Sequence, residues 1–328
     1  MTVDATVTRT VVREFEMDLS VAAVEAVAEG VLAITLSRPD GEPLPEWTPG
    51  AHVDLVLGES AEGLVRQYSL CGRTRDSDAW RVAVLRTPDS RGGSVAVHAL
   101  TAGSTVRVRG PRNHFPVVAA QRYLFLAGGI GITPLLAMVT EVDAAGADWE
   151  LHYGGRSRRS MAFLDELAAH GDRVHLVPED ELGRLDLDGL LGQPQPGTLV
   201  YACGPEPMLA AVEQRCVSWP AGALHLERFS ARATDAPEEE TGFDVELQRS
   251  GRTVHVPAER SIFDVVREAG VSVLGSCLEG ICGTCETEVV EGDVDHRDSV
   301  LDEEERAAGE VMMICVSRCR SERLVLDL

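Results

Sequence analysis

The sequence predicts three domains in succession: an antiparallel β-barrel, an α/β domain with a parallel sheet, and a small β-rich C-terminal domain. Short valine- and leucine-rich segments, separated by glycine and proline, fill the first part of the chain. Apolar segments then alternate with amphipathic ones, and a loop with three cysteines within ten residues follows later. With 328 residues, 44% of them hydrophobic, the chain is long enough for two or three domains.

The first domain is assigned to residues 21–117, after an N-terminal extension over residues 1–20. Turn-forming glycines and prolines separate its candidate strands, which are short. Six such strands favour a closed antiparallel barrel. In order they read VAAVEAVAE, VLAITLSR, AHVDLVL, LVRQYSL, WRVAVLR and TVRVRG.

The second domain is assigned to residues 118–230, where strand-like and helix-like segments alternate. The apolar segments YLFLA, WELHYGG, RVHLVP, TLVYACG and ALHLERF are the candidate strands. The amphipathic segments PLLAMVTEV, SMAFLDELAAHG and PMLAAVEQRC are the candidate helices. This alternation predicts a parallel sheet with helices on both faces.

Residues 231–241 are expected to form a linker, because they are polar, acidic and almost free of large apolar side chains. The third domain, residues 242–328, begins with a predicted hairpin that turns at Ser250 and Gly251. A helix follows, which Ser261 can cap and Gly270 can end. The cysteine-rich loop comes directly after this helix.

The formal net charge of −23 argues against a nucleic-acid partner, which would require a basic surface. The negative charge favours a protein partner with a basic patch. The alternative is that it only keeps the chain soluble. The sequence has no apolar run long enough for a transmembrane helix, and its charged N-terminus lacks the apolar centre of a signal peptide. We therefore expect a soluble cytoplasmic protein without a membrane partner, and we take it to act as a monomer.

The cysteine spacing C-x4-C-x2-C, with a fourth cysteine 29 intervening residues later, is the plant-type pattern for a [2Fe–2S] cluster held by four thiolates. Gly280 and Gly283 suit a loop that needs tight turns and backbone N–H groups aimed at sulfur. The expected metal ligands are Cys277, Cys282, Cys285 and Cys315.

Zinc is the main alternative occupant of this loop, since thiolates also hold structural zinc. Such sites usually pair two short knuckles, and the second knuckle is missing here. Disulfides are not expected in a cytoplasmic chain. Cys319 is a spare candidate for the fourth ligand, but it lies between two arginines, whereas Cys315 lies in the apolar run VMMICV. We therefore expect Cys315 to be the ligand.

The last 87 residues resemble a plant-type ferredoxin domain, which has a β-grasp fold. From about residue 20 onward, the whole chain resembles the phthalate dioxygenase reductase family, which includes the vanillate O-demethylase reductases. Members of that family join an FMN-binding barrel, a ferredoxin-reductase-like nucleotide domain and a C-terminal ferredoxin in this order. The resemblance therefore implies FMN, a [2Fe–2S] cluster, and NADH or NADPH as cofactors.

Two stretches of the barrel are candidates for the flavin site, although each alone could be an ordinary strand or turn. In RQYSL, Arg66 offers a cation for the phosphate, Tyr68 a flat surface for the ring and Ser69 a hydroxyl near N5, with Gln67 between them. The second stretch is a glycine-rich turn that enters a helix and can offer N–H groups to a phosphate. It comprises Arg91, Gly92, Gly93 and Ser94.

The turn LAGGIGITP after a predicted strand is a candidate nucleotide site, with an ordinary strand–helix turn as the alternative. Gly128, Gly129 and Gly131 allow a pyrophosphate to approach the backbone, and Thr133 can cap the next helix, with Pro134 in its first turn. Proline stands where the common dinucleotide fingerprint has a third glycine, so the turn matches the ferredoxin-reductase variant.

A second strand end, CGPEPM, opens another helix. The resemblance places Cys203 beside the nicotinamide C4, where a small polarizable group allows nicotinamide to approach the flavin. It adds Gly204 and Met208 to the nucleotide site. The resemblance also implies that Phe229 stacks on the flavin ring, and the alternative is a phenylalanine of the core.

The loop GGRSRRS is expected to discriminate between NADH and NADPH, because it follows the second strand of the nucleotide domain. Arginine suits a 2′-phosphate, whereas an acid suits a free ribose. The loop offers Arg156 and Ser157 as nucleotide contacts, together with two further arginines and no acid. The preference stays open, and a solvated helix entrance is the alternative.

The three predicted domains and their cofactors indicate a reductase. In it, NAD(P)H gives a hydride to FMN, FMN gives electrons one at a time to the cluster, and the cluster passes them to a partner protein. The expected partner is a terminal oxygenase, with a Rieske-type oxygenase of an aromatic or amine substrate ahead of a haem-thiolate monooxygenase. Two other classes are a redox sensor without turnover and a zinc-stabilised protein without electron transfer. Ser69 and Cys203 are the residues expected nearest to the chemistry.

Overall fold

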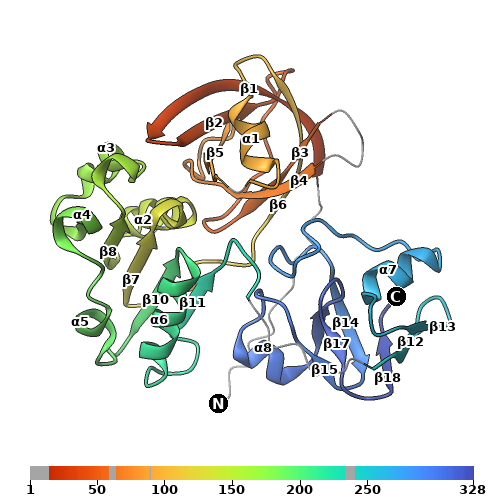
Figure 1. The fold of residues 1–328 in the computed structure, drawn as a ribbon. Coiled ribbons are helices and arrows are strands. Elements are labelled where there is room, and N and C mark those ends of the chain that lie inside the picture. The colour runs from red at the N-terminus through yellow and green to blue at the C-terminus, as the bar shows by residue number, and fades with distance from the viewer. Residues whose placement is uncertain (1–14, 59–63, 89, 233–240) are drawn as a thin grey trace.

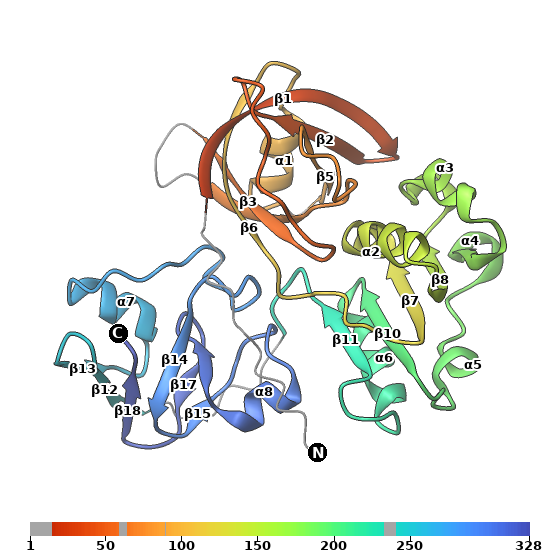
Figure 2. The same cartoon turned by 180° about the vertical axis from the view of Figure 1, so that it is seen from behind.

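The computed structural model describes residues 15–58, 64–88, 90–232 and 241–328. Most of the expected N-terminal extension and of the expected linker lies outside these residues. The chain forms a barrel, a nucleotide-domain unit next to the barrel on one side, and a C-terminal unit on the other (Figures 1 and 2). No helix among the described residues is long and apolar enough to cross a membrane.

Six strands form the barrel as one antiparallel sheet in the order β4-β3-β6-β1-β2-β5. They are β1 (Phe15–Ala28), β2 (Val31–Ser37), β3 (His52–Leu57), β4 (Leu64–Ser69), β5 (Trp80–Leu85) and β6 (Thr105–Arg112). A bridge between Leu70 and Val82 links the two ends of the sheet, which closes it into a barrel. The short helix α1 (Gly93–His98) packs against β3, β4 and β5 and buries Val97 in the core.

Five parallel strands form the second unit, in the order β11-β10-β7-β8-β9. They are β7 (Arg122–Gly128), β8 (Asp148–Gly155), β9 (Val174–Pro178), β10 (Thr198–Cys203) and β11 (Leu224–Glu227). Side chains alternate across this sheet. Tyr123 and Phe125 of β7 belong to one apolar core, whereas Leu124 and Leu126 belong to another. The sheet is therefore buried on both faces, as the sequence predicts.

Helices cover both faces of the parallel sheet. α2 (Ile132–Ala144) and α3 (Leu164–Leu167) cover one face, and α5 (Leu187–Leu191) and α6 (Glu206–Cys216) cover the other. The remaining turns are η1 (Gly129–Gly131), η2 (Arg158–Ser160), η3 (Ala168–Arg173) and α4 (Glu179–Leu182). The segment SMAFLDELAAHG does not form the single predicted helix. Phe163 takes a left-handed conformation with φ of 63°, which interrupts it and brings the ring 4.8 Å from the Arg81 guanidinium.

The C-terminal unit has a mixed sheet in the order β13-β12-β18-β14-β16. Its elements are β12 (Phe243–Leu247), β13 (Arg252–Val256), α7 (Ile262–Glu268), β14 (Glu286–Glu291), β15 (Val294–Asp295), α8 (Glu303–Ala308), β16 (Val311–Met313), β17 (Arg318–Cys319) and β18 (Arg323–Leu326). The Ser261 side chain caps α7 by accepting a hydrogen bond from the Asp264 N–H at 3.1 Å. A helix packed on a mixed sheet in which β12 and β18 run parallel is the expected β-grasp arrangement.

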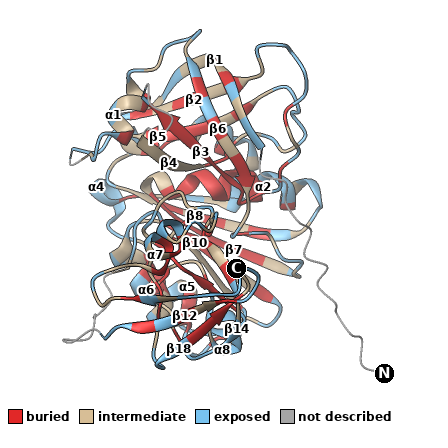
Figure 3. Ribbon diagram, turned by 90° about the vertical axis from the view of Figure 1, so that its right-hand side faces the viewer, coloured by how far each residue is buried: buried red, intermediate tan, exposed pale blue. Residues whose placement is uncertain are grey.

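The barrel and the nucleotide unit share one apolar core, whereas the C-terminal unit has its own. Val31, Ala33 and Ala83 of the barrel belong to the same buried cluster as Leu135 of α2 and Tyr153 of β8. The buried residues of α2 lie beneath the barrel in Figure 3. The C-terminal cluster contains only residues from Phe243 onward.

Candidate functional site

A pocket with about 610 Å³ of empty space, partly open to solvent, lies where the three units meet. Six of its lining residues are predicted flavin contacts: Arg66, Gln67, Tyr68, Ser69, Arg91 and Phe229. Phe229 is 44% exposed, so the alternative that it belongs to the core is wrong.

The edge position of β4 explains why four consecutive residues all line this pocket. Alternation directs Arg66 and Tyr68 to one face of the strand and Gln67 and Ser69 to the other. Because β4 is the last strand in the order of the sheet, the pocket lies along its edge and both faces reach it. Side chains from both faces of β4 therefore contribute to the pocket.

The two predicted phosphate-binding stretches are in contact. A guanidinium nitrogen of Arg66 donates to the Arg91 carbonyl at 3.2 Å. A Cβ on Gly93 would lie 2.6 Å from Cγ of Arg66, so only glycine permits this approach. Gly92 is the N-cap of α1 with φ of 91°, and the Ser94 hydroxyl donates to that of Ser90 at 3.0 Å. Two guanidinium groups beside a glycine turn fit a phosphate.

Glu227 is a pocket residue that the sequence reading missed. It ends β11, and the Ser69 hydroxyl donates to its carboxylate at 3.3 Å. Burial raises the pKa of the Glu227 carboxyl to about 8, although the bond from Ser69 acts in the opposite direction. Glu227 is therefore mostly protonated at pH 7. The only sequence signal was its position two residues before Phe229 in HLERF.

For a flavin in this pocket, as the sequence predicts, the rate of reduction by NAD(P)H is expected to fall as pH rises through about 8, by about 10-fold. Below this pH Glu227 is neutral, and above it a carboxylate charge lies beside the pocket and opposes the arrival of electrons. In Glu227→Gln, which keeps the shape without the charge, this pH dependence should disappear. Stopped-flow measurements of flavin absorbance between pH 6 and 9 give the reduction rates of the wild type and of Glu227→Gln. The same pH dependence in both proteins would contradict the assignment of Glu227 as the titrating group.

The two predicted nucleotide motifs meet at the ends of the neighbouring strands β7 and β10. A Cβ on Gly131 would lie 2.2 Å from the carbonyl oxygen of Cys203, and one on Gly128 would lie 2.7 Å from Sδ of Met208 and 3.2 Å from Cα of Gly204. Glycine therefore allows the two turns to approach each other. The third glycine of the turn, Gly129, has φ of 54°.

The predicted cap at Thr133 is wrong. α2 begins at Ile132, because the η1 turn leads directly into the helix, with Gly131 at the N-cap. Thr133 is buried inside the first turn, and its hydroxyl donates to the Ile130 carbonyl at 3.0 Å. Pro134 lies in the first turn, as expected.

Cys203 is completely buried and lies across from Glu227 in the register of β10 and β11. Burial raises the pKa of its thiol well above the usual value, and the neighbouring Glu227 adds to this effect. The thiol is therefore neutral, which agrees with a packing role and not with that of a nucleophile.

The loop with Arg156 and Ser157 lies at the end of β8 and is not part of the pocket lining. The structure brings acids to it that the sequence reading missed. Arg158 donates to both carboxylate oxygens of Glu181 at 3.0 Å, and the Asp180 N–H donates to the Arg156 carbonyl at 3.2 Å. The loop therefore offers less positive charge than its three arginines indicate.

The four predicted ligand cysteines converge. The Cys277 sulfur accepts a hydrogen bond from the Glu279 N–H at 3.3 Å, and the Cys282 sulfur accepts one from the Cys277 N–H at 3.5 Å. The Cys315 thiol is within hydrogen-bonding reach of those of Cys277 and Cys285. Backbone N–H groups aimed at sulfur fit an iron–sulfur cluster, whose thiolates they stabilise.

Glycine is required in this loop for conformation and for space. Gly280 and Gly283 both have φ of 69°. A Cβ on Gly283 would lie 2.2 Å from the ring of His114, which belongs to the segment that follows the barrel strands. Cys319 lies elsewhere, with its sulfur 3.1 Å from the Ser321 hydroxyl.

A polar network connects the barrel to the cysteine loop. The Ser276 hydroxyl donates to the buried carboxylate of Asp54 at 2.7 Å, and the Gln67 amide donates to Ser276 at 2.7 Å and to Asp54 at 2.9 Å. Arg91 forms an ion pair with Glu279. Gln67, predicted as a cofactor contact, thus also bridges two units.

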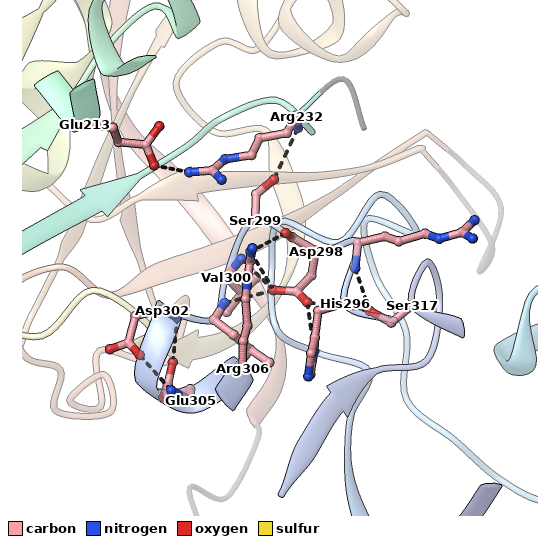
Figure 4. Close-up of polar contacts among 12 residues, drawn as sticks. Glu213, Arg232, His296, Asp298, Ser299, Val300, Asp302, Glu305, Arg306 and Ser317 are labelled. Carbon is pink, nitrogen blue, oxygen red and sulfur yellow. Dashed lines mark hydrogen bonds and ion pairs between the residues drawn. The ribbon is translucent and has the colours of Figure 1, made fainter. Parts of the chain in front are cut away.

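A second polar network surrounds Asp298 and Ser299 (Figure 4). The Asp298 carboxylate accepts hydrogen bonds from two following N–H groups, and the Ser299 N–H donates to the Gly280 carbonyl at 2.8 Å. The Ser299 hydroxyl accepts a bond at 3.2 Å from the N–H of Arg232, whose side chain pairs with Glu213 of α6. The nucleotide unit is thereby tied to the same loop.

Comparison with known proteins identifies related sequences and structures. The 2Fe-2S iron-sulfur cluster binding domain family matches residues 245–320. Phenoxybenzoate dioxygenase subunit beta of Ectopseudomonas oleovorans is 45% identical over 95% of this chain and 97% of its own length. A solved phthalate dioxygenase reductase is 37% identical, with a TM-score of 0.67 over 95% of this chain and 98% of its own.

An intact type IV self-sufficient cytochrome P450 monooxygenase is 48% identical over 95% of this chain, with a TM-score of 0.90. This chain spans 41% of that protein.

Proposed function

Because the chain belongs to the phthalate dioxygenase reductase family of oxygenase reductases, we propose that the pocket between its three units is the flavin site of an electron path. The chain is an oxidoreductase that passes electrons from NAD(P)H through FMN and a [2Fe–2S] cluster to an oxygenase. One observation supports the site above all others. The same pocket is lined by Phe229, which follows the last strand of the nucleotide unit, and by Cys277, a proposed cluster ligand.

The residues of the pocket divide into three roles in this proposal. Arg66 and Arg91 would hold the FMN phosphate, Tyr68 and Phe229 would flank its ring, and Ser69 would lie near N5. Bound FMN supplies the exchange between two-electron transfer from NAD(P)H and one-electron transfer to the cluster. The hydroxyl of Ser69 and the protonated carboxyl of Glu227 would hold a proton beside the flavin ring.

The nucleotide would bind at the joined ends of β7 and β10, where Gly129 has open space at its Cβ position while Gly128 and Gly131 pack against the other turn. The neutral, buried Cys203 would let the nicotinamide approach closely, and Arg156 and Ser157 would lie near the ribose. The proposed cluster ligands are the four converging cysteines. In sequence terms, we propose functional units at residues 118–230 and 242–328, joined by a linker at 231–241. The first unit begins at Phe15 and not at the expected residue 21, because residues 15–20 belong to β1 and pair with β6 of the barrel.

Addition of NAD(P)H to the purified protein without oxygen is expected to bleach both the flavin and the [2Fe–2S] absorption. The flavin should bleach first, because the pocket lies between the nucleotide unit and the cysteine loop. Stopped-flow spectra and the reduced-cluster EPR signal follow the two centres separately. A colourless zinc protein, or a cluster that stays oxidised after the flavin is reduced, would contradict the proposal.

The partner is a terminal oxygenase, and we propose that its electron acceptor is a Rieske-type centre. Relatives named as phthalate and phenoxybenzoate dioxygenase components support this choice. A haem-thiolate acceptor is the second candidate, supported by the 48% identity to part of a self-sufficient P450. Reduction rates for a purified Rieske oxygenase and a P450 domain, measured with the same reductase, distinguish the two.

A further inference from the structure

A second group of candidate ligands lies away from the pocket, at the outer edge of the parallel sheet. β9 is the edge strand and β8 is its neighbour. Glu150 and His152 lie two residues apart on β8 and so share a face. His175 of β9 pairs with His152 across the two strands. One ligand atom from each of the three side chains lies within 4.8 Å of the other two.

The distance between Glu150 and His152 fits a shared ion better than a hydrogen bond, and the distance between Glu150 and His175 is slightly longer than a shared ion requires. Oε2 of Glu150 lies 3.4 Å from Nε2 of His152 and 3.7 Å from Nε2 of His175. Both distances exceed the usual range of N–H···O bonds. Two ligands on one tetrahedral ion, with bonds of about 2.0–2.2 Å, lie about 3.3–3.6 Å apart. The two imidazole rings are stacked, with centroids 4.4 Å apart.

Two further observations indicate that the group is arranged for a ligand. Nε2 of His152 is buried and has no hydrogen-bond partner among the described residues. Arg122 of β7 donates to the other oxygen of Glu150, Oε1, at 2.6 Å. This bond fixes the carboxylate so that Oε2 faces the two histidines, as outer partners orient ligands in metal sites.

We propose that Glu150, His152 and His175 form a binding site for a divalent transition-metal ion, with Zn²⁺ as the expected occupant. Two imidazoles and one carboxylate are a ligand set that suits zinc and leaves a fourth position for water. The His175 side chain is 45% exposed, which gives the ion a path from solvent. The bound ion would join the edge strand to its neighbour, close to the end of β8 at Gly155.

The test uses the full-length protein with its flavin and cluster in place, so that the cluster cysteines are occupied. Titration calorimetry with Zn²⁺ is expected to show one site with micromolar or tighter affinity. His152→Ala and His175→Ala should each weaken it by about 100-fold. Cu²⁺ EPR of the oxidised protein should show hyperfine coupling to two imidazole nitrogens, and to fewer in either variant.

His255→Ala is the matched control, because His255 is an exposed histidine that pairs with Asp244 on the C-terminal sheet. It should bind Zn²⁺ as the wild type does. His175 is half-exposed on an edge strand, so its variant is expected to fold, and unchanged visible spectra check this. Absence of binding below about 100 μM Zn²⁺, or wild-type affinity in both histidine variants, would overturn the proposal.

Discussion

Replacing Cys315 by serine is expected to abolish the [2Fe–2S] absorption and to lower electron transfer to the oxygenase by about 100-fold or more. Cys315 is buried, and its thiol reaches those of Cys277 and Cys285. Serine cannot replace a thiolate ligand here without loss of cluster stability. NAD(P)H should still bleach the flavin, because the nucleotide and flavin residues lie in other units. Visible spectra, iron content and cytochrome c reduction measure these effects.

Cys319→Ser is the matched control for this prediction. Cys319 is four residues from Cys315, but its sulfur contacts the Ser321 hydroxyl at 3.1 Å and the Arg323 carbonyl at 3.5 Å. The variant should keep the full cluster absorption and activity. The reverse result, with the cluster lost in the Cys319 variant and kept in the Cys315 variant, would show that the fourth ligand had been assigned to the wrong cysteine.

Gly131→Ala is expected to raise KM for NAD(P)H by about 5- to 150-fold, the equivalent of a packing penalty of about 1–3 kcal/mol. The added Cβ would lie 2.2 Å from the carbonyl oxygen of Cys203. Backbone atoms cannot rotate away as a side chain can, so the ends of β7 and β10 must move apart. Because the proposed nucleotide site spans these two ends, binding should suffer more than the fold. Steady-state kinetics and the thermal midpoint separate these two effects.

Gly72→Ala provides the control for that variant. A Cβ on Gly72 would meet Cβ of Arg81 at 3.5 Å, which is ordinary van der Waals contact. This variant should show unchanged KM and unchanged flavin content. If Gly131→Ala bound NAD(P)H as tightly as Gly72→Ala does, the joined strand ends would not form the nucleotide site.

The fold class could be predicted from the sequence because each domain has its own local pattern. Parallel strands buried on both faces gave apolar runs, and the barrel strands were short and separated by turn residues. Predictions of single caps and breaks were less successful. Threonine is a residue type that often caps helices. The η1 turn before Thr133 leads directly into α2, however, so the helix begins at Ile132. Phe163 interrupts the predicted helix with a left-handed backbone and lies against Arg81 of the barrel, and helical periodicity reveals neither feature.

The candidate site could be predicted where its residues lie close together in one motif. The flavin stretch at Arg66–Ser69 and the cysteine loop are motifs of this kind. Glu227 could not be found from the sequence. It lies 158 residues from Ser69 along the chain and in a different unit, and only the fold brings the two together. The acid beside Arg158 was missed for the same reason, since Glu181 belongs to another element.

The two contact surfaces of the barrel differ in chemistry, and this difference determines which parts of the chain can separate. Pulling the nucleotide unit away would expose the shared apolar side chains to water, at a cost that grows with their area. The seam with the C-terminal unit consists of groups such as Asp54, Ser276 and Glu279, which water can solvate after separation. The iron-bearing unit is therefore the one suited to swing outward and present its charge to an external acceptor.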